Sequence, residues 1–140
     1  MAMTYNIPIQ EHLGKYLDYA VKTGVKIFQG ALVGLEAASG FARPLVAGDA
    51  LLGHSMDEYD NTDGADGDIK AKVLAGDAAK GYLLTVLVDG VVVTSINAAV
   101  FASDDGTLSL TDGGSDSEVG KVANYIEDGK AVVQFLPFSL

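Results

Sequence analysis

Cysteine and tryptophan are absent from these 140 residues, and proline occurs only three times. A chain without cysteine forms no disulfide and no thiolate metal site, and it is suited to folding in a reducing cytoplasm. Basic residues are also scarce, because nine Lys and Arg stand against nineteen Asp and Glu and give a net charge of −10. A nucleic-acid-binding protein needs a basic surface, and an anionic membrane repels an acidic chain. We therefore expect neither nucleic acid nor a membrane as a partner.

Long uninterrupted hydrophobic runs are missing as well. The N-terminal segment MAMTYNIPIQEH has neither the basic nor the apolar region of a secretory signal. The most apolar stretch, GYLLTVLVDGVVVTSINAAVFA, is interrupted by Asp89-Gly90, which argues against a membrane-spanning helix. We expect a soluble protein, and the length is that of one domain.

Glycine is abundant, with 17 residues. Each glycine inside a helix costs about 1 kcal/mol relative to alanine, whereas tight turns between strands use glycine where φ is positive. From Val25 onward, short apolar segments alternate with turn signals roughly every eight to twelve residues. The sequence therefore predicts an all-β fold over residues 25–140, a small barrel or sandwich of short antiparallel strands.

The first 24 residues have a different pattern. In EHLGKYLDYAV, the residues Leu13, Leu17 and Val21 recur at helical spacing, and Pro8 blocks a helix just before them. We therefore expect an N-terminal arm or short helix over residues 1–24. It either packs on its own domain or docks on a neighbouring protein, and the sequence leaves both open. Its deletion is expected to leave the β-domain folded.

Two local patterns further along the chain make specific predictions. IKAKVL (residues 69–74) alternates apolar and basic residues, as in a half-buried strand. Asp89-Gly90 lies between two valine-rich runs, which predicts either a two-residue β-hairpin or a bulge in a longer connection.

A faint internal repeat is also visible. ALVGLEAASGFARPLVAGDALLGHSMDEY (residues 31–59) and AVFASDDGTLSLTDGGSDSEVGKVANYI (residues 99–126) share an order of features. Each has a strand, a turn ending in Gly, a short strand, a polar turn, and then Leu-Gly or Val-Gly. Two copies of one β-unit would account for this order, and so would coincidence between two segments with few identities.

Aspartate residues crowd into residues 99–122, which raises the question of a metal or acid–base site. An EF-hand needs D-x-[DN]-x-[DN]-G with Glu at position twelve, and neither this segment nor DNTDGADGD has that register. Asp and Gly are also the residues that tight turns select. We therefore predict turns here, and the residues that form them are Asp104, Asp105, Asp112 and Asp116. Within these turns we expect positive φ at Gly106 and Gly113.

Catalytic motifs are not recognised in the sequence. It contains no G-x-S-x-G, no phosphate-binding G-x-x-x-x-G-K-[ST] and no G-x-G-x-x-G. Only His12 and His54 are candidate bases, and His54 lies in a strand pattern where a packed or surface histidine is expected. Paired carboxylates perform glycoside hydrolysis, but six Tyr and five Phe are few for a sugar-binding cleft. We expect no enzyme, no cofactor and no metal site.

The segment GALVGLEAASGFARPLVAGDALLGHSMDEYDN, together with AVFASDDGTLSLT, SEVGKV and AVVQFLPF, resembles the head decoration (capsid cement) proteins of tailed bacteriophages. The resemblance covers about residues 25–138. It implies a small β-rich domain on the outer surface of the virion capsid, made in the host cytoplasm. It further implies homotrimers at three-fold or quasi-three-fold sites that contact the major capsid protein and stabilise the expanded head.

In such a protein, residues 1–24 are expected to contact the capsid by adding a strand to a sheet edge or by lying in a groove. The expected contact residues are Tyr5, Ile7, Ile9, Leu13, Tyr16, Leu17 and Tyr19. Two alternatives stay open. One is another virion β-domain, associated with a tail or fibre, and the other is a calcium- or carbohydrate-binding module that uses the acidic loop at residues 57–68.

Overall fold

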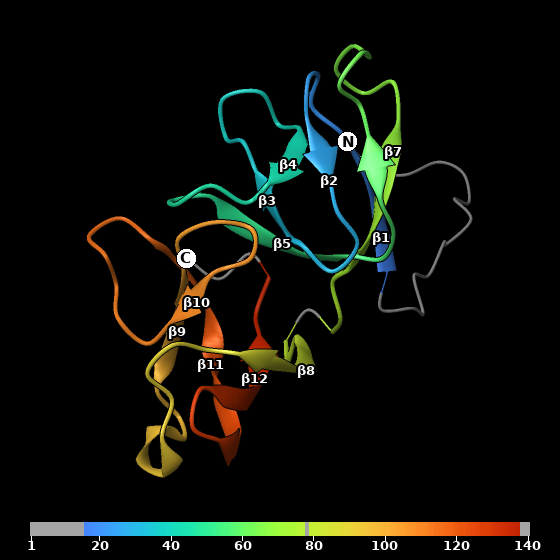
Figure 1. The fold of residues 1–140 in the computed structure, drawn as a ribbon. Coiled ribbons are helices and arrows are strands. Elements are labelled where there is room, and N and C mark those ends of the chain that lie inside the picture. The colour runs from blue at the N-terminus through green and yellow to red at the C-terminus, as the bar shows by residue number, and fades with distance from the viewer. Residues whose placement is uncertain (1–15, 78, 138–140) are drawn as a thin grey trace, which may run out of the picture.

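The computed structural model describes residues 16–77 and 79–137, and nearly all of the regular structure in them is β-strand (Figure 1). The only helical element in these residues is the short 3₁₀ turn η1 (Val93–Ser95). No helix in the described part of the chain is long and apolar enough to cross a membrane. The predicted all-β fold of short antiparallel strands is therefore confirmed.

The first half of the chain forms a five-stranded antiparallel sheet with the strand order β1-β7-β5-β3-β4. The strands are β1 (Tyr16–Ala20), β3 (Leu32–Leu35), β4 (Ala42–Pro44), β5 (Ala50–Ser55) and β7 (Lys70–Leu74). A parallel bridge between Val21 and Ala42 joins the two outer strands, so the sheet curls into a partly closed barrel. The short strands β2 (Lys26–Ile27) and β6 (Tyr59–Asp60) pair separately. We call residues 16–74 the first barrel.

The second half repeats this arrangement with the order β8-β12-β11-β9-β10. Its strands are β8 (Tyr82–Leu87), β9 (Ala99–Ala102), β10 (Leu108–Ser109), β11 (Ser117–Glu127) and β12 (Lys130–Phe135). A parallel bridge between Asp89 and Ser109 again joins the outer strands. We call residues 82–137 the second barrel. Figure 1 shows the two barrels as separate groups of strands, one above the other.

The strand order shows that the predicted internal repeat is a repeat of the fold. Each strand of the first sheet has a counterpart at the same place in the second sheet: β1 corresponds to β8, β3 to β9, β4 to β10, β5 to β11 and β7 to β12. The register agrees with this correspondence, because Gly53 pairs with Val33 and Gly120 pairs with Val100. In both sheets the ladder slips by one residue beside this glycine, which is a β-bulge. The chain is therefore built from two copies of one five-stranded unit.

The two barrels pack against each other through a shared core. Leu32, Leu45 and Leu51 belong to the first barrel, but they pack in the hydrophobic cluster of the second barrel. A separate cluster fills the interior of the first barrel with Val21, Ile27, Ala31, Val33, Ala42, Leu52, Ala71 and Val73. Because the cluster of the second barrel includes side chains from both barrels, the described residues form one domain.

Strand β7 has the predicted alternation. Ala71 and Val73 are fully buried, whereas Lys70 and Lys72 are exposed. Successive side chains of a strand point to opposite faces, so the period of two places the lysines in solvent. The prediction made from IKAKVL is confirmed.

Residues 16–20 are a strand, so the predicted short helix is wrong for this segment. All five residues of β1 pair with β7, from Tyr16 opposite Leu74 to Ala20 opposite Lys70, and Val21 is fully buried. Pairing with a strand far along the chain has overridden the helical spacing of the apolar residues. Deletion of residues 1–24 would remove an outer strand of the first barrel, so the structure does not favour the expectation that the domain folds without them.

Asp89-Gly90 does not form a two-residue hairpin. The chain leaves β8, passes through η1 and reaches β9 only at Ala99, so this dipeptide lies in a longer connection. Val88 and Val91 on either side of it are buried in the core of the second barrel. The connection is fixed in this conformation by the burial of the two valines and by the bridge between Asp89 and Ser109.

Candidate interaction surfaces

Three of the seven predicted contact residues lie in the described part of the chain, and these three do not share one face of the sheet. Tyr5, Ile7, Ile9 and Leu13 lie outside the described residues, and Tyr16, Leu17 and Tyr19 lie in β1. Because β1 is a strand, Tyr16 and Tyr19 point to opposite faces of the sheet. Tyr16 is 43% exposed, whereas Tyr19 packs against the core of the first barrel, and this burial raises the pKa of its phenol. Of these residues, only Tyr16 is exposed on the outside of the described chain.

Three of the four aspartates predicted to form turns in residues 99–122 close them with their side chains: Asp104, Asp112 and Asp116. The backbone N–H groups of Gly106 and Thr107 both donate to Oδ1 of Asp104 at 2.8 Å. The bond from Gly106 is the main cause of a lowered pKa at Asp104. Asp112 likewise accepts a bond from Gly114 N–H at 2.9 Å. These carboxylates satisfy backbone donors that the turns would otherwise leave without protein partners.

The positive φ predicted for Gly106 and Gly113 is wrong. Neither glycine lies in the left-handed region, and in this segment Gly114 does, with φ of +118°. Gly106 and Gly113 instead donate their N–H groups to Asp104 and Asp116. A turn closed by an aspartate side chain does not require a left-handed residue at these positions.

The acidic loop at residues 57–68 also uses its carboxylates within the protein. Asp60 accepts bonds from Thr62, Asp66 accepts one from the N–H of Thr23, and Asp68 accepts one from the N–H of Ala65. Across residues 16–77 and 79–137, no group of three or more His, Cys, Asp and Glu is placed to hold a metal ion. These three carboxylates are therefore occupied within the protein, two in turns of the loop and one by the backbone of Thr23.

His54 connects the two barrels. Its Nδ1 lies 2.6 Å from the hydroxyl of Tyr82, and its ring contacts that of Phe135 edge-on, with 4.5 Å between centroids. The side chain is only 7% exposed, and burial lowers the pKa of the imidazole to about 4. Of the two roles expected for His54, a packed or a surface histidine, the structure shows the packed one. The same residue lines a cavity of about 240 Å³ at the junction of the barrels, beside Leu32 and Leu87.

Acid is expected to weaken the fold through His54. The imidazole has a pKa near 6.5 when exposed and about 4 when folded, so the unfolded chain binds the proton more readily between these values. This contribution to stability is complete above pH 6.5 and is lost as the pH falls towards 4, by about 2 kcal/mol between pH 7 and pH 5. Urea unfolding at both pH values measures it. In His54→Gln this part of the pH dependence should disappear, and an unchanged dependence would contradict the assignment.

Large apolar side chains are exposed in one stretch of the second barrel. Leu83 is 60% exposed and Leu87 is 75% exposed on β8, which is an outer strand of its sheet. We call this stretch the apolar ridge, and it comprises Leu83, Leu87, Val92, Val93 and Ile96. Sequence reasoning missed it because the two runs around Asp89-Gly90 were interpreted only as strands of a hairpin or a longer connection. The available signal was YLLTVL, which is apolar on both faces and therefore not the pattern of a strand with one face in water.

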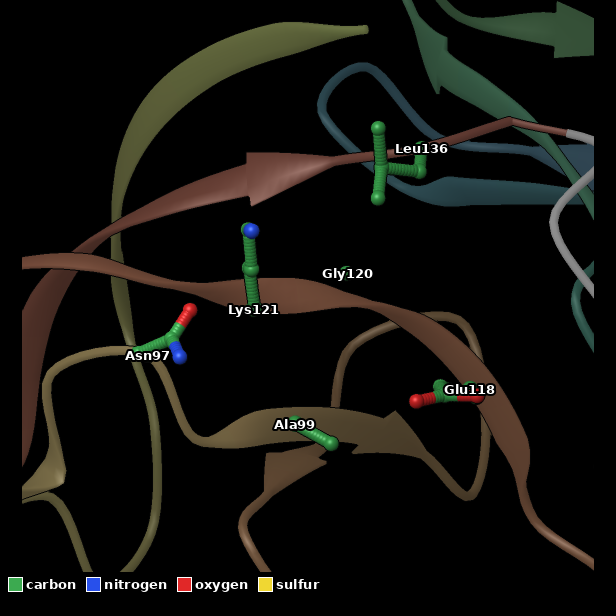
Figure 2. A pocket seen from close by; sticks show the side chains of 6 residues that line it. All are labelled: Asn97, Ala99, Glu118, Gly120, Lys121 and Leu136. Carbon is green, nitrogen blue, oxygen red and sulfur yellow. The ribbon is translucent and has the colours of Figure 1, made fainter. Parts of the chain in front are cut away.

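A shallow hollow of about 170 Å³ lies on the outside of the second barrel (Figure 2). Glu118 and Lys121 lie on either side of Gly120 on β11, and all three residues line the hollow. We call this surface the open face, and it is lined by Asn97, Ala99, Glu118, Gly120, Lys121 and Leu136. Asn97 has φ of +74°, which makes it the one non-glycine residue with positive φ in the described chain.

Comparison with known proteins gives no relative, because no family model matches the chain and no curated protein sequence matches it. The functional assignment therefore depends on the surfaces of this chain. Its two candidate surfaces differ in chemistry: the apolar ridge is hydrophobic, and the open face carries one charge of each sign.

Proposed function

We propose that this protein is a structural protein of a bacteriophage particle that binds the outer surface of the expanded head. It attaches as trimers to the major capsid protein and stabilises the shell. The apolar ridge is the observation that carries this proposal. Five of the ten exposed large hydrophobic residues in the described chain lie within fourteen positions of the second barrel, and gathered apolar surface is typical of an interaction site.

The energetics of the apolar ridge fit attachment to another protein. Full burial of a leucine or valine side chain contributes about 1.5–3 kcal/mol, so covering Leu83 and Leu87 would supply a large part of a binding free energy. β8 pairs with β12 on one side only, so its other edge has backbone groups available to a partner. Three linked contacts in a trimer would increase the avidity through effective concentration.

Two of the residues considered for chemistry, His54 and Asp104, have structural partners, which supports a protein without enzymatic activity, and His12 lies outside the described residues. His54 is packed between the barrels, and Asp104 accepts bonds from the backbone of its own turn. The net charge of −10 suits a protein that must stay soluble at high copy number before assembly.

Co-sedimentation with phage heads tests the proposal. The chain is expected to pellet with expanded heads and to stay in solution with compact precursor heads. Leu83→Asp and Leu87→Asp should each weaken this binding at least tenfold, because each places a charge in the apolar contact. Val46→Asp is the matched control, since Val46 is also an exposed aliphatic residue but lies in the first barrel, outside the apolar ridge.

Two outcomes would contradict the proposal. The first is the absence of pelleting with either form of head, or pelleting with tails only. The second is equal binding by the wild type, Leu83→Asp and Leu87→Asp, which would leave the apolar ridge without a role in attachment.

A further inference from the structure

One face of the first barrel is buried in the contact between the two barrels. The equivalent face of the second barrel is exposed. In the first barrel this face contains Leu51 and His54 of β5, and both are buried against the second barrel. The corresponding residues of β11 are Glu118 and Lys121, and both are exposed. The open face of the second barrel is therefore the structural equivalent of a buried interface.

The backbone confirms that the two faces correspond. In the first barrel, Gly30 N–H donates to the carbonyl of Ser55 at 2.9 Å, and in the second, Asn97 N–H donates to that of Val122 at 2.7 Å. Gly30 has φ of +82° and Asn97 has φ of +74°. Asn97 thus has the same backbone conformation as Gly30, its counterpart in the covered face. Positive φ is unusual for a residue with a side chain.

The second barrel reaches the first through the turn at residues 103–107. The carbonyl of Asp105 in this turn accepts a bond from Leu32 N–H at 2.9 Å. The turn joins β9 to β10, so its counterpart in the first barrel is the turn at residues 36–40, which joins β3 to β4. Residues 37–40 are exposed, and Gly40 N–H donates to the carbonyl of Glu36. The chain therefore presents an uncovered face at one barrel and the matching uncovered turn at the other.

We propose that the open face binds the turn at residues 36–40 of a second copy of this chain. Successive copies would then associate head to tail, in the way that the two barrels associate within one chain. Such a contact uses two different surfaces, so it produces a closed ring or a filament according to the rotation between copies. The inference continues an interface that already exists within the chain, and it does not depend on binding to a phage head.

The charges of the open face suit a contact that forms and dissociates. Leu51 and His54 are covered within the chain itself, whereas Glu118 and Lys121 are in water when the chain is alone. Charged residues around a small apolar centre, here Ala99 and Gly120, are typical of interfaces between separately soluble partners. The segment Ala37-Ala38-Ser39 has small side chains that suit a hollow of about 170 Å³.

Sedimentation velocity of the full chain over a range of concentrations tests this inference. The wild type is expected to associate reversibly. Ala38→Arg in the turn and Ala99→Arg in the open face should each raise the dissociation constant at least tenfold. Glu118→Arg is a second open-face variant at an exposed position, in case Ala99→Arg impairs folding. Ala65→Arg, an equal change at an exposed alanine outside both surfaces, should associate like the wild type.

A mixture of two variants distinguishes a head-to-tail contact from a symmetric one. Ala38→Arg keeps an intact open face and Ala99→Arg keeps an intact turn, so the mixture should form one-to-one dimers and no larger species. The inference is overturned if the wild type stays monomeric at every concentration, if it associates equally after either substitution, or if the mixture forms no dimer. Because no heads are present, these outcomes are independent of the head-binding experiment.

Discussion

Replacement of Gly120 by alanine is expected to lower the free energy of unfolding by about 3 kcal/mol or more. A Cβ at this position would overlap the carbonyl oxygen of Gln134 on the neighbouring strand β12. This atom belongs to the backbone of a paired strand, so it has no rotamer by which to move away. The two strands would have to separate where Gly120 pairs with Phe135. Urea unfolding followed by far-ultraviolet circular dichroism measures the loss.

Gly129→Ala is the matched control, because it separates the destabilisation caused by steric overlap from the destabilisation caused by an unfavourable backbone conformation. Gly129 has φ of +84°, but no neighbouring atom lies within 4 Å of the position that a Cβ would take there. Gly120, in contrast, lies outside the left-handed region. The control should therefore cost only about 1 kcal/mol, the usual strain of a left-handed alanine. Equal losses in the two variants would contradict the steric argument.

The internal repeat extends this prediction to Gly53. A Cβ there would overlap the carbonyl oxygen of Leu74 on β7, which repeats the relation between Gly120 and Gln134. Gly53 also has φ of +145°, so Gly53→Ala adds backbone strain to the overlap. Its loss of stability should equal or exceed that of Gly120→Ala.

Replacement of Arg43 by methionine is expected to cost about 3–5 kcal/mol, because it leaves the buried carboxylate of Asp49 without its cation. Nε of Arg43 donates to Oδ2 of Asp49 at 2.9 Å, and Nη2 donates to Oδ1 at 2.7 Å. Asp49 is only 7% exposed, and its hydrogen bond with Arg43 is the main cause of a raised pKa at the guanidinium. A third donor, Nη1, reaches Glu36 at 2.6 Å. Thermal or urea unfolding measures the change.

Two further variants test whether burial of the charge is the cause. Lys26→Met breaks the exposed pair between Lys26 and Glu58, whose atoms are 3.3 Å apart, and should cost at most about 1 kcal/mol. Asp49→Asn in the Arg43→Met background should recover part of the loss, because an amide is less costly to bury than a carboxylate. If Arg43→Met is no more harmful than Lys26→Met, the pair contributes little.

Local chemistry made much of the fold predictable from the sequence. Asp104 and Asp112 were identified as turn residues because aspartate closes turns with its own side chain, whatever the rest of the chain does. The exposed and buried faces of β7 were predictable in the same way. Lysines and apolar residues alternate along it, and this period of two is that of a strand with one face in solvent. In both cases the determining contacts lie within a few residues.

Features that depend on distant parts of the chain could not be predicted in this way. β1 has helical spacing, and only its pairing with β7, more than fifty residues later, makes it a strand. Leu51 and Glu118 occupy equivalent positions, yet one is buried and the other is exposed. This difference arises from the packing of one barrel on the other, so the open face became visible only when the repeat was seen in three dimensions.

The shared core has a consequence for synthesis on the ribosome. Leu32, Leu45 and Leu51 pack in a cluster whose other buried residues all lie between Tyr82 and Phe135. At about 5–20 residues per second, roughly 4–17 s pass between translation of Leu51 and that of Phe135. During this interval the nascent first barrel carries an uncovered apolar face, so chaperones should bind nascent chains stalled between these two lengths more than they bind the released, folded chain.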